Sequence, residues 1–415
     1  VIARTDIVEI IESRVSLKKT GQNYTGLCPF HQEKTPSFSV SQEKQFYYCF
    51  GCQASGSALK FLMEFDRLDF VQAVEHLAQR VGMEVPREGR KDSVVSEKRK
   101  SIYEMLDQSA IFYREQLRKS DSRGRAVDYL KGRGLSGEIA QAFAIGYAPP
   151  GWDNLLKQLA VSNADRQVLI DSGMLNDIPE ESKTYDRFRD RVMFPIRDLR
   201  GRTIAFGGRV VDDNAKPKYL NSPETAVFHK GRELYGLFEA RRRERILSRL
   251  IVVEGYMDVV ALAQHGINGC VATLGTATST DHIERMFRIV KTIVFCFDGD
   301  AAGRNAAWKA LLAAIPAMED GCMAKFLFLP DGEDPDTYVR QFGPKAFTIE
   351  FEKALGFTEF FFQHLESTLD ISTTEGKAAL SKVAVPLIRG LPVGVFKQLV
   401  IKELSNRTGL DSDQL

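Results

Sequence analysis

Short runs of β-branched and aromatic residues form the most regular pattern along this chain. Three of them, residues 251–253, 292–297 and 326–329, are separated by segments in which apolar residues recur at helical spacing. Runs of this length that alternate with helices are typical of buried parallel strands. The pattern therefore predicts an α/β unit over 250–340, in which the strands of an open sheet end at a shared edge.

Acidic residues follow each of the three predicted strands. They are Glu254 and Asp258 after the first, Asp298 and Asp300 after the second, and Asp334 and Asp336 after the third. If the strands are parallel neighbours, the six carboxylates converge on one edge of the sheet, where divalent cations would offset their mutual repulsion. Oxygen ligands in this number suit Mg²⁺ or Mn²⁺. Acids after a strand are also common as turn and helix-cap residues, and this alternative stays open.

Three cysteines and one histidine form two close pairs near the start of the chain. Cys28 and His31 are followed, after 17 residues, by Cys49 and Cys52. Two pairs at this separation are typical of a tetrahedral structural zinc site, here with three thiolates and one imidazole. Alternating residues over 37–40 and 45–48 predict strands that the metal closes into a ribbon, with helices over 56–65 and 70–81 covering it.

Aromatic residues are concentrated around this predicted ribbon, with lysines between them. They are Phe38, Phe46, Tyr47, Tyr48 and Phe50, with Lys34 and Lys44. Such a set can form a stacking and charge surface for single-stranded nucleic acid. The alternative is that the rings pack the small core of the ribbon, and we expect this of at least half of them.

The segment over 86–100 is charged and has little apolar periodicity, which predicts a mobile linker. A helix is expected over 102–118 and short strands over 191–196 and 203–209. After the α/β unit, helices are expected over 351–355, 357–365, 377–388 and 395–404. The chain of 415 residues, 44% hydrophobic, is long enough for two or three domains.

The near-neutral net charge of +1 conceals a strong asymmetry. Residues 183–249 contain 17 Lys and Arg against 9 Asp and Glu, whereas residues 250–340 contain 7 against 12. A basic segment followed by an acidic one suits a polyanion-binding surface beside a metal cluster. Two ordinary solvated faces would give the same counts, so this interpretation stays open on charge alone.

Neither a membrane span nor a leader is expected. No apolar run approaches the roughly 18 residues that a span requires, and the first residues lack the apolar core of a signal peptide. Cysteine usage does not indicate a disulfide framework, because Cys270, Cys296 and Cys322 lie singly in apolar surroundings typical of a core. We therefore expect a cytoplasmic protein without membrane contact.

Short motifs follow one another along nearly the whole chain. They are Cys-Pro-Phe-His over 28–31, Glu-Lys-Thr-Pro-Ser-Phe over 33–38, Tyr-Cys-Phe-Gly-Cys over 48–52, Arg-Val-Met-Phe-Pro-Ile over 191–196, Pro-Lys-Tyr-Leu-Asn-Ser-Pro over 217–223, Glu-Gly-Tyr-Met-Asp over 254–258, Asp-Gly-Asp over 298–300 and Asp-Gly-Glu-Asp-Pro-Asp over 331–336. Together, and in this order, they resemble the motifs of the bacterial DNA primases. The resemblance implies a multidomain α/β protein with Toprim, the metal-binding α/β unit, at its centre.

The resemblance also implies a division of the chain. We expect a zinc-ribbon domain over 1–85, the linker over 86–100, a basic α+β subdomain over 101–249, the Toprim parallel-sheet subdomain over 250–340 and a helical subdomain over 341–415. Family members usually continue into a C-terminal domain that binds the replicative helicase. Because few residues follow the α/β unit, that domain is expected to be absent here.

The activity implied by the resemblance is synthesis of short RNA primers on a single-stranded DNA template for DNA replication. Ribonucleoside triphosphates are then the substrates and an RNA–DNA hybrid is the product. The expected cofactors are one structural Zn²⁺ and two or more catalytic Mg²⁺ or Mn²⁺. The catalytic residues would be Glu254, Asp298 and Asp300, with Glu254 either a metal ligand or a general base.

The resemblance assigns the acids of the sheet edge and nearby polar residues to different tasks. Metal binding falls to Glu254, Asp298, Asp300, Asp334 and Asp336, with Asp258 supporting, and contact with the triphosphate or the template falls to Arg209, Lys218, Asn221 and Lys230. Two other functions compete with primer synthesis. A topoisomerase or nuclease shares the Toprim unit, although no segment here indicates the DNA-binding domain that carries a nucleophilic tyrosine. A non-enzymatic, zinc-dependent single-strand-binding protein would not need three acidic strand ends.

Overall fold

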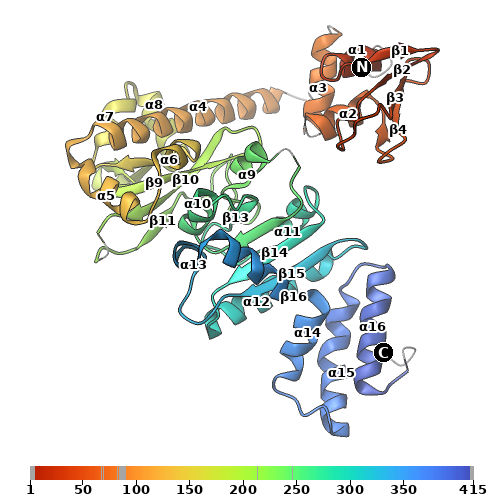
Figure 1. Cartoon of the computed structure of the whole chain (residues 1–415). Coiled ribbons are helices and arrows are strands. Elements are labelled where there is room, and N and C mark those ends of the chain that lie inside the picture. The colour runs from red at the N-terminus through yellow and green to blue at the C-terminus, as the bar shows by residue number, and fades with distance from the viewer. Residues whose placement is uncertain are drawn as a thin grey trace. The chain divides into compact units, whose positions relative to one another are not determined.

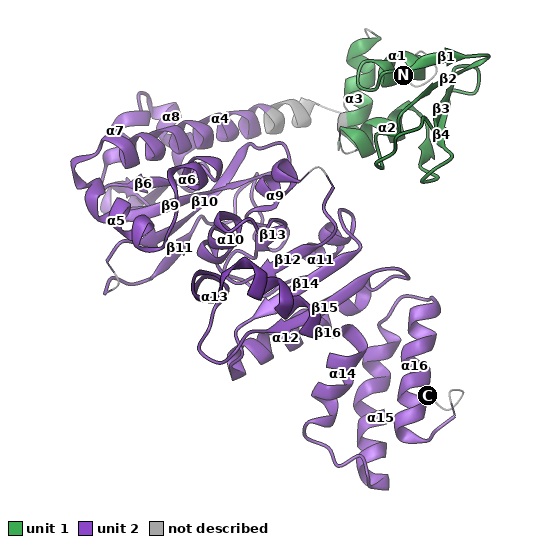
Figure 2. Ribbon diagram, in the orientation of Figure 1, with its two compact units in different colours: residues 1–95 green, residues 96–415 purple. Residues whose placement is uncertain are grey.

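The structure, a computed structural model, describes residues 5–66, 68, 70–81, 83, 90–212, 214–244 and 246–411. Contacts within the chain divide it into two compact units, residues 1–95 and 96–415 (Figure 2). No helix in the described part of the chain is both long and apolar enough to cross a membrane.

Unit 1 is built on a five-stranded antiparallel sheet. Its strands, in spatial order, are β1 (Lys18–Thr20), β2 (Asn23–Gly26), β3 (Phe38–Ser41), β4 (Phe46–Cys49) and β5 (Ser55–Gly56). Helices α1 (Ile7–Glu12), α2 (Ala58–Phe65) and α3 (Phe70–Arg80) pack their apolar side chains with those of the sheet. The predicted helices over 56–65 and 70–81 are confirmed, and the two expected strands are the centre of a larger sheet.

Helix α4 (Arg90–Lys119) includes residues 90–100 of the segment expected to be a linker over 86–100, so this part is helical; residues 86–89 lie outside the described residues. The side chains of residues 97–100 are exposed, whereas Ile102 and Leu106 are fully buried. Ile102 and Leu106 anchor the helix in the core, and the exposed residues 97–100 continue it towards its N-terminus. Lys, Arg and Glu are good helix formers, so a helix does not need an apolar stripe along its whole length.

The first part of unit 2 contains a four-stranded antiparallel sheet, in the order β11 (Tyr219–Asn221), β10 (Thr203–Val210), β9 (Arg191–Arg197) and β6 (Gly146–Ala148). Strands β9 and β10 are buried along nearly their whole length. A separate hairpin joins β7 (Leu175–Ile178) and β8 (Lys183–Asp186). The helices of this part are α5 (Gly124–Gly132), α6 (Gly137–Ala142), α7 (Asn154–Leu159), α8 (Asn163–Asp171) and α9 (Leu237–Arg243).

The predicted open sheet is present in the second part of unit 2. Its order is β13 (Cys270–Ala272), β12 (Leu250–Val253), β14 (Thr292–Phe297), β15 (Met323–Phe328) and β16 (Leu355–Gly356). The first four strands are parallel, and β16 pairs antiparallel with β15. The connecting helices are α10 (Tyr256–Gln264), α11 (Thr280–Phe287), α12 (Ala301–Ala314) and α13 (Pro335–Glu350). Two apolar clusters that share the strands β12, β13, β14 and β15 bury the sheet.

Three helices follow the sheet and lie side by side as a bundle (Figure 1): α14 (Phe357–Glu366), α15 (Thr374–Arg389) and α16 (Val395–Thr408). The helix expected over 351–355 is instead a single 3₁₀ turn, Phe351–Lys353, followed by the edge strand β16. The sheet therefore extends beyond residue 340, where the sequence predicted the parallel-sheet unit to end. Helix α13 also crosses that position, with a break at Gly343.

Candidate functional site

The three acidic strand ends lie next to one another, as predicted. Strand β14 lies between β12 and β15, and all three run in the same direction. The chain leaves β12 through α10 to reach β13 on one side, then passes through α11 to β14 on the other side of β12. Glu254 follows β12 and Asp298 follows β14, so these acids flank the point where the strand order reverses. Crevices at such points are where open α/β sheets bind ligands.

Several of these acids also cap helices, so the capping alternative is correct for part of the set. Asp300 accepts a 2.7 Å hydrogen bond from the Gly303 N–H at the start of α12. Asp334 caps α13 in the same way, and Asp258 accepts from the Gly255 N–H. A single oxygen makes each of these bonds. Capping therefore fixes the carboxylates of Asp300 and Asp334 while leaving each a second oxygen.

Repulsion within the cluster is evident in its ionisation. Loss of part of its hydration raises the pKa of Glu254 even though its side chain keeps access to solvent, and the charges of Asp298 and Asp300 raise it further. The pKa of Asp298 is raised by burial and by Asp334 and Asp300. Burial, followed by Asp334 and Asp336, raises the pKa of Asp258 to about 8. Carboxylates whose ionised forms are destabilised in this way are a suitable environment for a divalent cation, which would stabilise the ionised forms.

Asp336 differs from the other acids because two guanidinium groups already neutralise it. One oxygen accepts a 2.6 Å hydrogen bond from Arg133 Nη1, and the other accepts a 2.8 Å bond from Arg340 Nε. Its side chain is 1% exposed. The sequence predicted Asp336 as a metal ligand, but a carboxylate with both oxygens in ion pairs would first have to release an arginine. The structure gives Asp336 a part in joining the α5–α6 turn to α13.

The four predicted nucleotide-binding residues lie in different environments. Lys218 is exposed, and Lys230 lies near Glu224. Arg209 is 1% exposed, with its guanidinium 4.5 Å from the centre of the Tyr129 ring. The amide of Asn221 accepts a 2.7 Å bond from the Tyr256 hydroxyl and donates a 2.8 Å bond to the Leu274 carbonyl.

An aromatic surface that the sequence analysis missed lies on the basic part of unit 2. The Trp152 ring is 56% exposed and meets Tyr185 edge to face, with ring centres 5.3 Å apart. Arg189 and Lys183 place their cations 4.3 and 5.2 Å from the centre of the Trp152 ring. The sequence carries no local signal of this surface, because Lys183 and Arg189 lie more than about 30 positions after Trp152 and the hairpin that brings Tyr185 to it has no distinctive motif.

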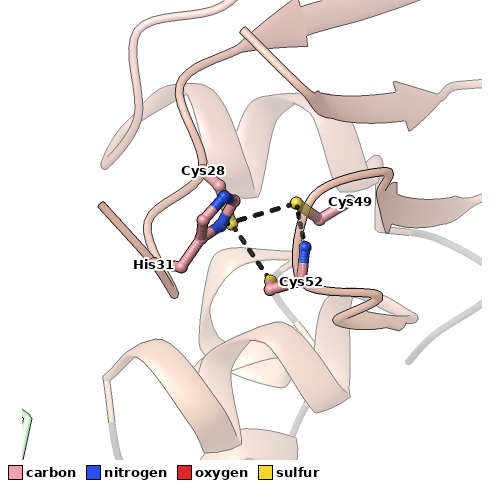
Figure 3. A group of neighbouring side chains, drawn as sticks. All are labelled: Cys28, His31, Cys49 and Cys52. Carbon is pink, nitrogen blue, oxygen red and sulfur yellow. Dashed lines mark hydrogen bonds between the residues drawn. The ribbon is translucent and has the colours of Figure 1, made fainter. Parts of the chain in front are cut away.

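The zinc ligands predicted in unit 1 converge (Figure 3). One ligand atom from each of Cys28, His31, Cys49 and Cys52 lies within 4.8 Å of the others. The sulfurs of Cys28 and Cys52 are 3.7 Å apart, close to the roughly 3.8 Å expected for two thiolates on a tetrahedral zinc with Zn–S bonds of about 2.3 Å. The donor set therefore fits a structural zinc ion. Among the described residues, no other group of potential ligand atoms is gathered as closely.

Backbone donors prepare the Cys49 sulfur to bind a cation. The N–H groups of Gly51 and Cys52 approach it at 3.3 and 3.4 Å, and Ser37 Oγ lies 3.2 Å away. Burial opposes ionisation of Cys49, but the hydrogen bonds from the N–H groups of Cys52 and Gly51 favour the thiolate, and the pKa of Cys49 is lowered to about 7. A thiolate available near neutral pH is the form that binds zinc.

The aromatic residues of the ribbon divide between its core and its surface. Phe38 and Tyr47 are fully buried and pack with Phe30 and Phe61. Phe46, Tyr48 and Phe50 remain 43, 37 and 75% exposed. Two of the five predicted rings therefore belong to the core, fewer than expected, and three are available on the surface.

Four family models match successive parts of the chain. Residues 1–93 match the CHC2 zinc finger, residues 112–241 the N-terminal domain of the DNA primase catalytic core, and residues 251–339 the Toprim-like family. Residues 358–413 match the DnaB-helicase binding domain of primase. The last match overturns the expectation that such a segment is absent. That expectation rested on the number of residues left, whereas helices α14 to α16 are enough to form the matching segment.

Similar proteins of known name are DNA primases. The chain is 57% identical to DNA primase of Pseudomonas putida over 417 residues, which cover 100% of this chain and 63% of that protein. It is 52% identical to DNA primase of Escherichia coli K12 over 419 residues, covering 100% of this chain and 71% of that protein. The chain thus spans less than two thirds of the Pseudomonas relative.

Solved primase structures have the same fold. A DnaG primase catalytic domain bound to single-stranded DNA is 51% identical, covers 77% of this chain and 100% of its own, and gives a TM-score of 0.73. The Aquifex aeolicus primase, with zinc-binding and RNA polymerase domains, is 32% identical, covers 99% of this chain and 96% of its own, and gives 0.64. Together with the ordered family matches, these similarities show that the chain belongs to the bacterial DNA primase family.

Proposed function

We propose that this chain synthesises short RNA primers on a single-stranded DNA template for DNA replication. The observation that carries the proposal is the convergence of Glu254, Asp298 and Asp300 beside the β12–β14 switch point, in a protein of the primase family. A cluster of carboxylates with raised pKa values is suited to the two-metal joining of nucleotides. Ribonucleoside triphosphates would be the substrates and an RNA–DNA hybrid the product.

The ions that fit this edge are two or more Mg²⁺ or Mn²⁺. When bound, they would neutralise triphosphate charge and favour deprotonation of the attacking 3′-hydroxyl. Glu254, Asp298, Asp300 and Asp334 are the ligands that we propose, and half-buried Asp258 supports them by fixing the start of α10. Glu254 is exposed at the end of β12, which would also allow it to accept the hydroxyl proton as a general base.

Charged groups near this edge would hold the triphosphate. Lys218 is exposed and would contact phosphate directly. Lys230 lies near Glu224, and a bound phosphate would replace this carboxylate as its anionic neighbour. Arg209 and Asn221 have protein partners, so we assign them to shaping the site through Tyr129 and the Leu274 loop. The amide of Asn221 joins that loop to Tyr256, which follows Glu254 by two residues.

Template strand binding is assigned to two surfaces, one on each unit. On unit 2 it is the stacking platform of Trp152 and Tyr185 with the cations of Lys183 and Arg189. On unit 1 it is the exposed group Phe46, Tyr48 and Phe50. Aromatic rings beside cations bind single strands through base stacking and phosphate attraction. The similar catalytic domain bound to single-stranded DNA supports single-strand binding by this chain.

Two further assignments follow from the family. Helices α14 to α16 would contact the replicative helicase, supported by their match to the DnaB-helicase binding model. Since the template is chromosomal DNA, the enzyme would act in the cytoplasm. The domain boundaries predicted from the sequence stay a proposal, with the sheet of the Toprim unit extended to β16.

The test is template-dependent incorporation of labelled ribonucleotides on defined single strands, with Mg²⁺ or Mn²⁺ added. Short RNA products that disappear when the template is omitted, and that Asp298→Asn does not make, would support the proposal. Relaxation or cutting of supercoiled DNA, without RNA synthesis, would favour the topoisomerase or nuclease alternative. Tight single-strand binding with no reaction would favour a binding protein.

A further inference from the structure

A single carboxylate lies behind the zinc-binding group of unit 1. Glu33 Oε1 accepts a 2.6 Å hydrogen bond from the backbone N–H of Cys28 and a 3.1 Å bond from that of Ser37. Its Oε2 accepts a 2.5 Å bond from the Ser37 hydroxyl and lies 3.2 Å from His31 Nε2. The Glu33 side chain is 9% exposed, so these four contacts surround it almost completely.

These contacts reach three of the four zinc ligands by different routes. Cys28 is held through its backbone, His31 through its ring, and Cys49 through the Ser37 hydroxyl, which lies 3.2 Å from the Cys49 sulfur. We propose that Glu33 is the positioning residue of the zinc centre, and that it fixes His31 as a ligand through Nδ1.

The two ring nitrogens of His31 face different groups, and this explains how Glu33 would select the nitrogen that binds zinc. Nδ1 is the ring nitrogen that faces the ligands, 3.7 Å from the Cys49 sulfur, whereas Nε2 faces Glu33. A neutral imidazole has one protonated nitrogen and one with a free lone pair. The Glu33 carboxylate is an anion 3.2 Å from Nε2, so its charge favours the tautomer that carries the proton on Nε2 and leaves the lone pair on Nδ1. Carboxylates commonly orient metal-binding histidines in this way, and they raise the basicity of the ligand.

Close packing keeps the ring in this orientation. A Cβ atom added at Gly51 would lie 2.5 Å from His31 Nε2 and 3.0 Å from Ser37 Oγ. The backbone of the second ligand pair therefore covers the His31–Glu33–Ser37 contacts directly. Glycine is required here for space, because any side chain would displace the ring that Glu33 holds.

The test compares zinc affinity of the full chain carrying Glu33→Gln with that of the parent protein, measured by transfer of Zn²⁺ to a chromophoric chelator. Glutamine keeps one oxygen for the backbone N–H groups but offers an amide donor in place of the second oxygen. We expect zinc affinity to fall about 10- to 100-fold. Glu43→Gln, an exposed acid-to-amide change in the same ribbon, should leave it unchanged.

A second measurement separates orientation of the ligand from simple support of the loop. The chain has six histidines, so ¹⁵N-histidine labelling gives a tractable spectrum of zinc-loaded protein. The parent should show His31 with metal on Nδ1 and a slowly exchanging proton on Nε2. In Glu33→Gln this proton should exchange faster, because the nearby negative charge that favours its place on Nε2 has been removed.

Either of two results would overturn the proposal. One is unchanged zinc affinity in Glu33→Gln. The other is reduced affinity with the His31 Nε2 proton unaltered, which would make Glu33 a support for the loop only. Both readouts depend on zinc binding and neither on RNA synthesis, so they decide the question even if the proposed activity is absent.

Discussion

Arg133 donates a 2.6 Å hydrogen bond to the carboxylate of Asp336, a residue 203 positions further along the chain. Asp336 is 1% exposed, whereas Arg133 is 29% exposed. The buried acid is thus held by a cation that reaches in from the surface. A partner so distant in sequence joins the basic part of unit 2 to the parallel-sheet part.

Asp336→Asn should lower the free energy of unfolding by about 1–3 kcal/mol, because Arg133 and Arg340 would lose a shared anion while staying partly solvated. Urea unfolding measures the change, with the exposed acid Glu352→Gln as the control. The loss should be equal with and without Mg²⁺. A loss that appears only in the presence of Mg²⁺ would instead make Asp336 a metal ligand.

Asp298→Asn should separate activity from stability. Primer synthesis should fall by about 100-fold or more, since a metal ligand is lost. The melting temperature without metal should rise, because the raised pKa of Asp298 means that its ionised form is unfavourable in the folded protein. Glu319→Gln, an exposed change away from the carboxyl ends of the strands, should alter neither. Full activity of Asp298→Asn would exclude Asp298 from the mechanism.

Zinc removal should unfold unit 1 and spare unit 2. Small metal-bound segments gain much of their stability from ligation, and unit 2 has its own apolar clusters. Both tryptophans, Trp152 and Trp308, lie in unit 2. The thermal unfolding transition that their fluorescence reports should therefore be unchanged after chelation, whereas the part of the circular dichroism signal that comes from unit 1 should be lost. Extension of a supplied primer should persist weakly, whereas initiation should be lost.

Cys49→Ser should reproduce the effect of chelation, and returning Zn²⁺ should restore the parent protein only. A tryptophan transition that shifts together with the loss of zinc would show that the two units unfold as one.

His282 should make unit 2 less stable in mild acid. Burial lowers its pKa, and its Nε2 lies 2.8 Å from the Lys230 carbonyl, which needs a donor there, while Nδ1 accepts from the Ser279 N–H. Below about pH 6.5 the unfolded chain binds a proton that the folded protein rejects, so stability falls as the pH decreases. Tryptophan-monitored unfolding from pH 5 to 8 should show a shallower fall for His282→Gln. Parallel curves would remove His282 from the pH dependence.

Trp152→Ala should weaken single-strand binding about 5- to 150-fold, because stacking on an aromatic ring is worth about 1–3 kcal/mol per base. The salt dependence of binding should stay the same, since no charge is removed, whereas Lys183→Ala should reduce it. Fluorescence anisotropy of a labelled oligonucleotide measures both effects. Trp152→Phe, which keeps a ring, should bind more tightly than Trp152→Ala.

The site was predictable from the sequence where it depends on strand ends and ligand spacing. Apolar runs located strands that end before Glu254 and Asp298, and the paired spacing predicted Cys28 and Cys49 as ligands of one metal. Each strand end and each ligand pair is local, so a short stretch of sequence contains the information for it, whereas the pairing of β12 with β14 was the condition on which the predicted cluster rested.

Contacts between distant elements were not predictable in this way. Nothing near Asp336 indicates Arg133, and nothing near Trp152 indicates the hairpin of Tyr185. The first turns of α4 were also missed, because a charged sequence lacks the apolar stripe on which recognition of a helix depends. These features arise from tertiary packing and from helix propensity rather than from a hydrophobic pattern.

Backbone hydrogen bonds between β12 and β14 fix the spacing of the acidic residues at the ends of these strands. The pairing of Val252 with Phe295 sets how far Glu254 lies from Asp298, and neighbouring strands are always about 4.8 Å apart. A slip of one residue would move one acid by about 3.3 Å and turn its strand's side chains to the opposite face. Misplacement of these acids by strand slippage therefore comes in whole steps, and the sheet has no register in which the two are only slightly out of place.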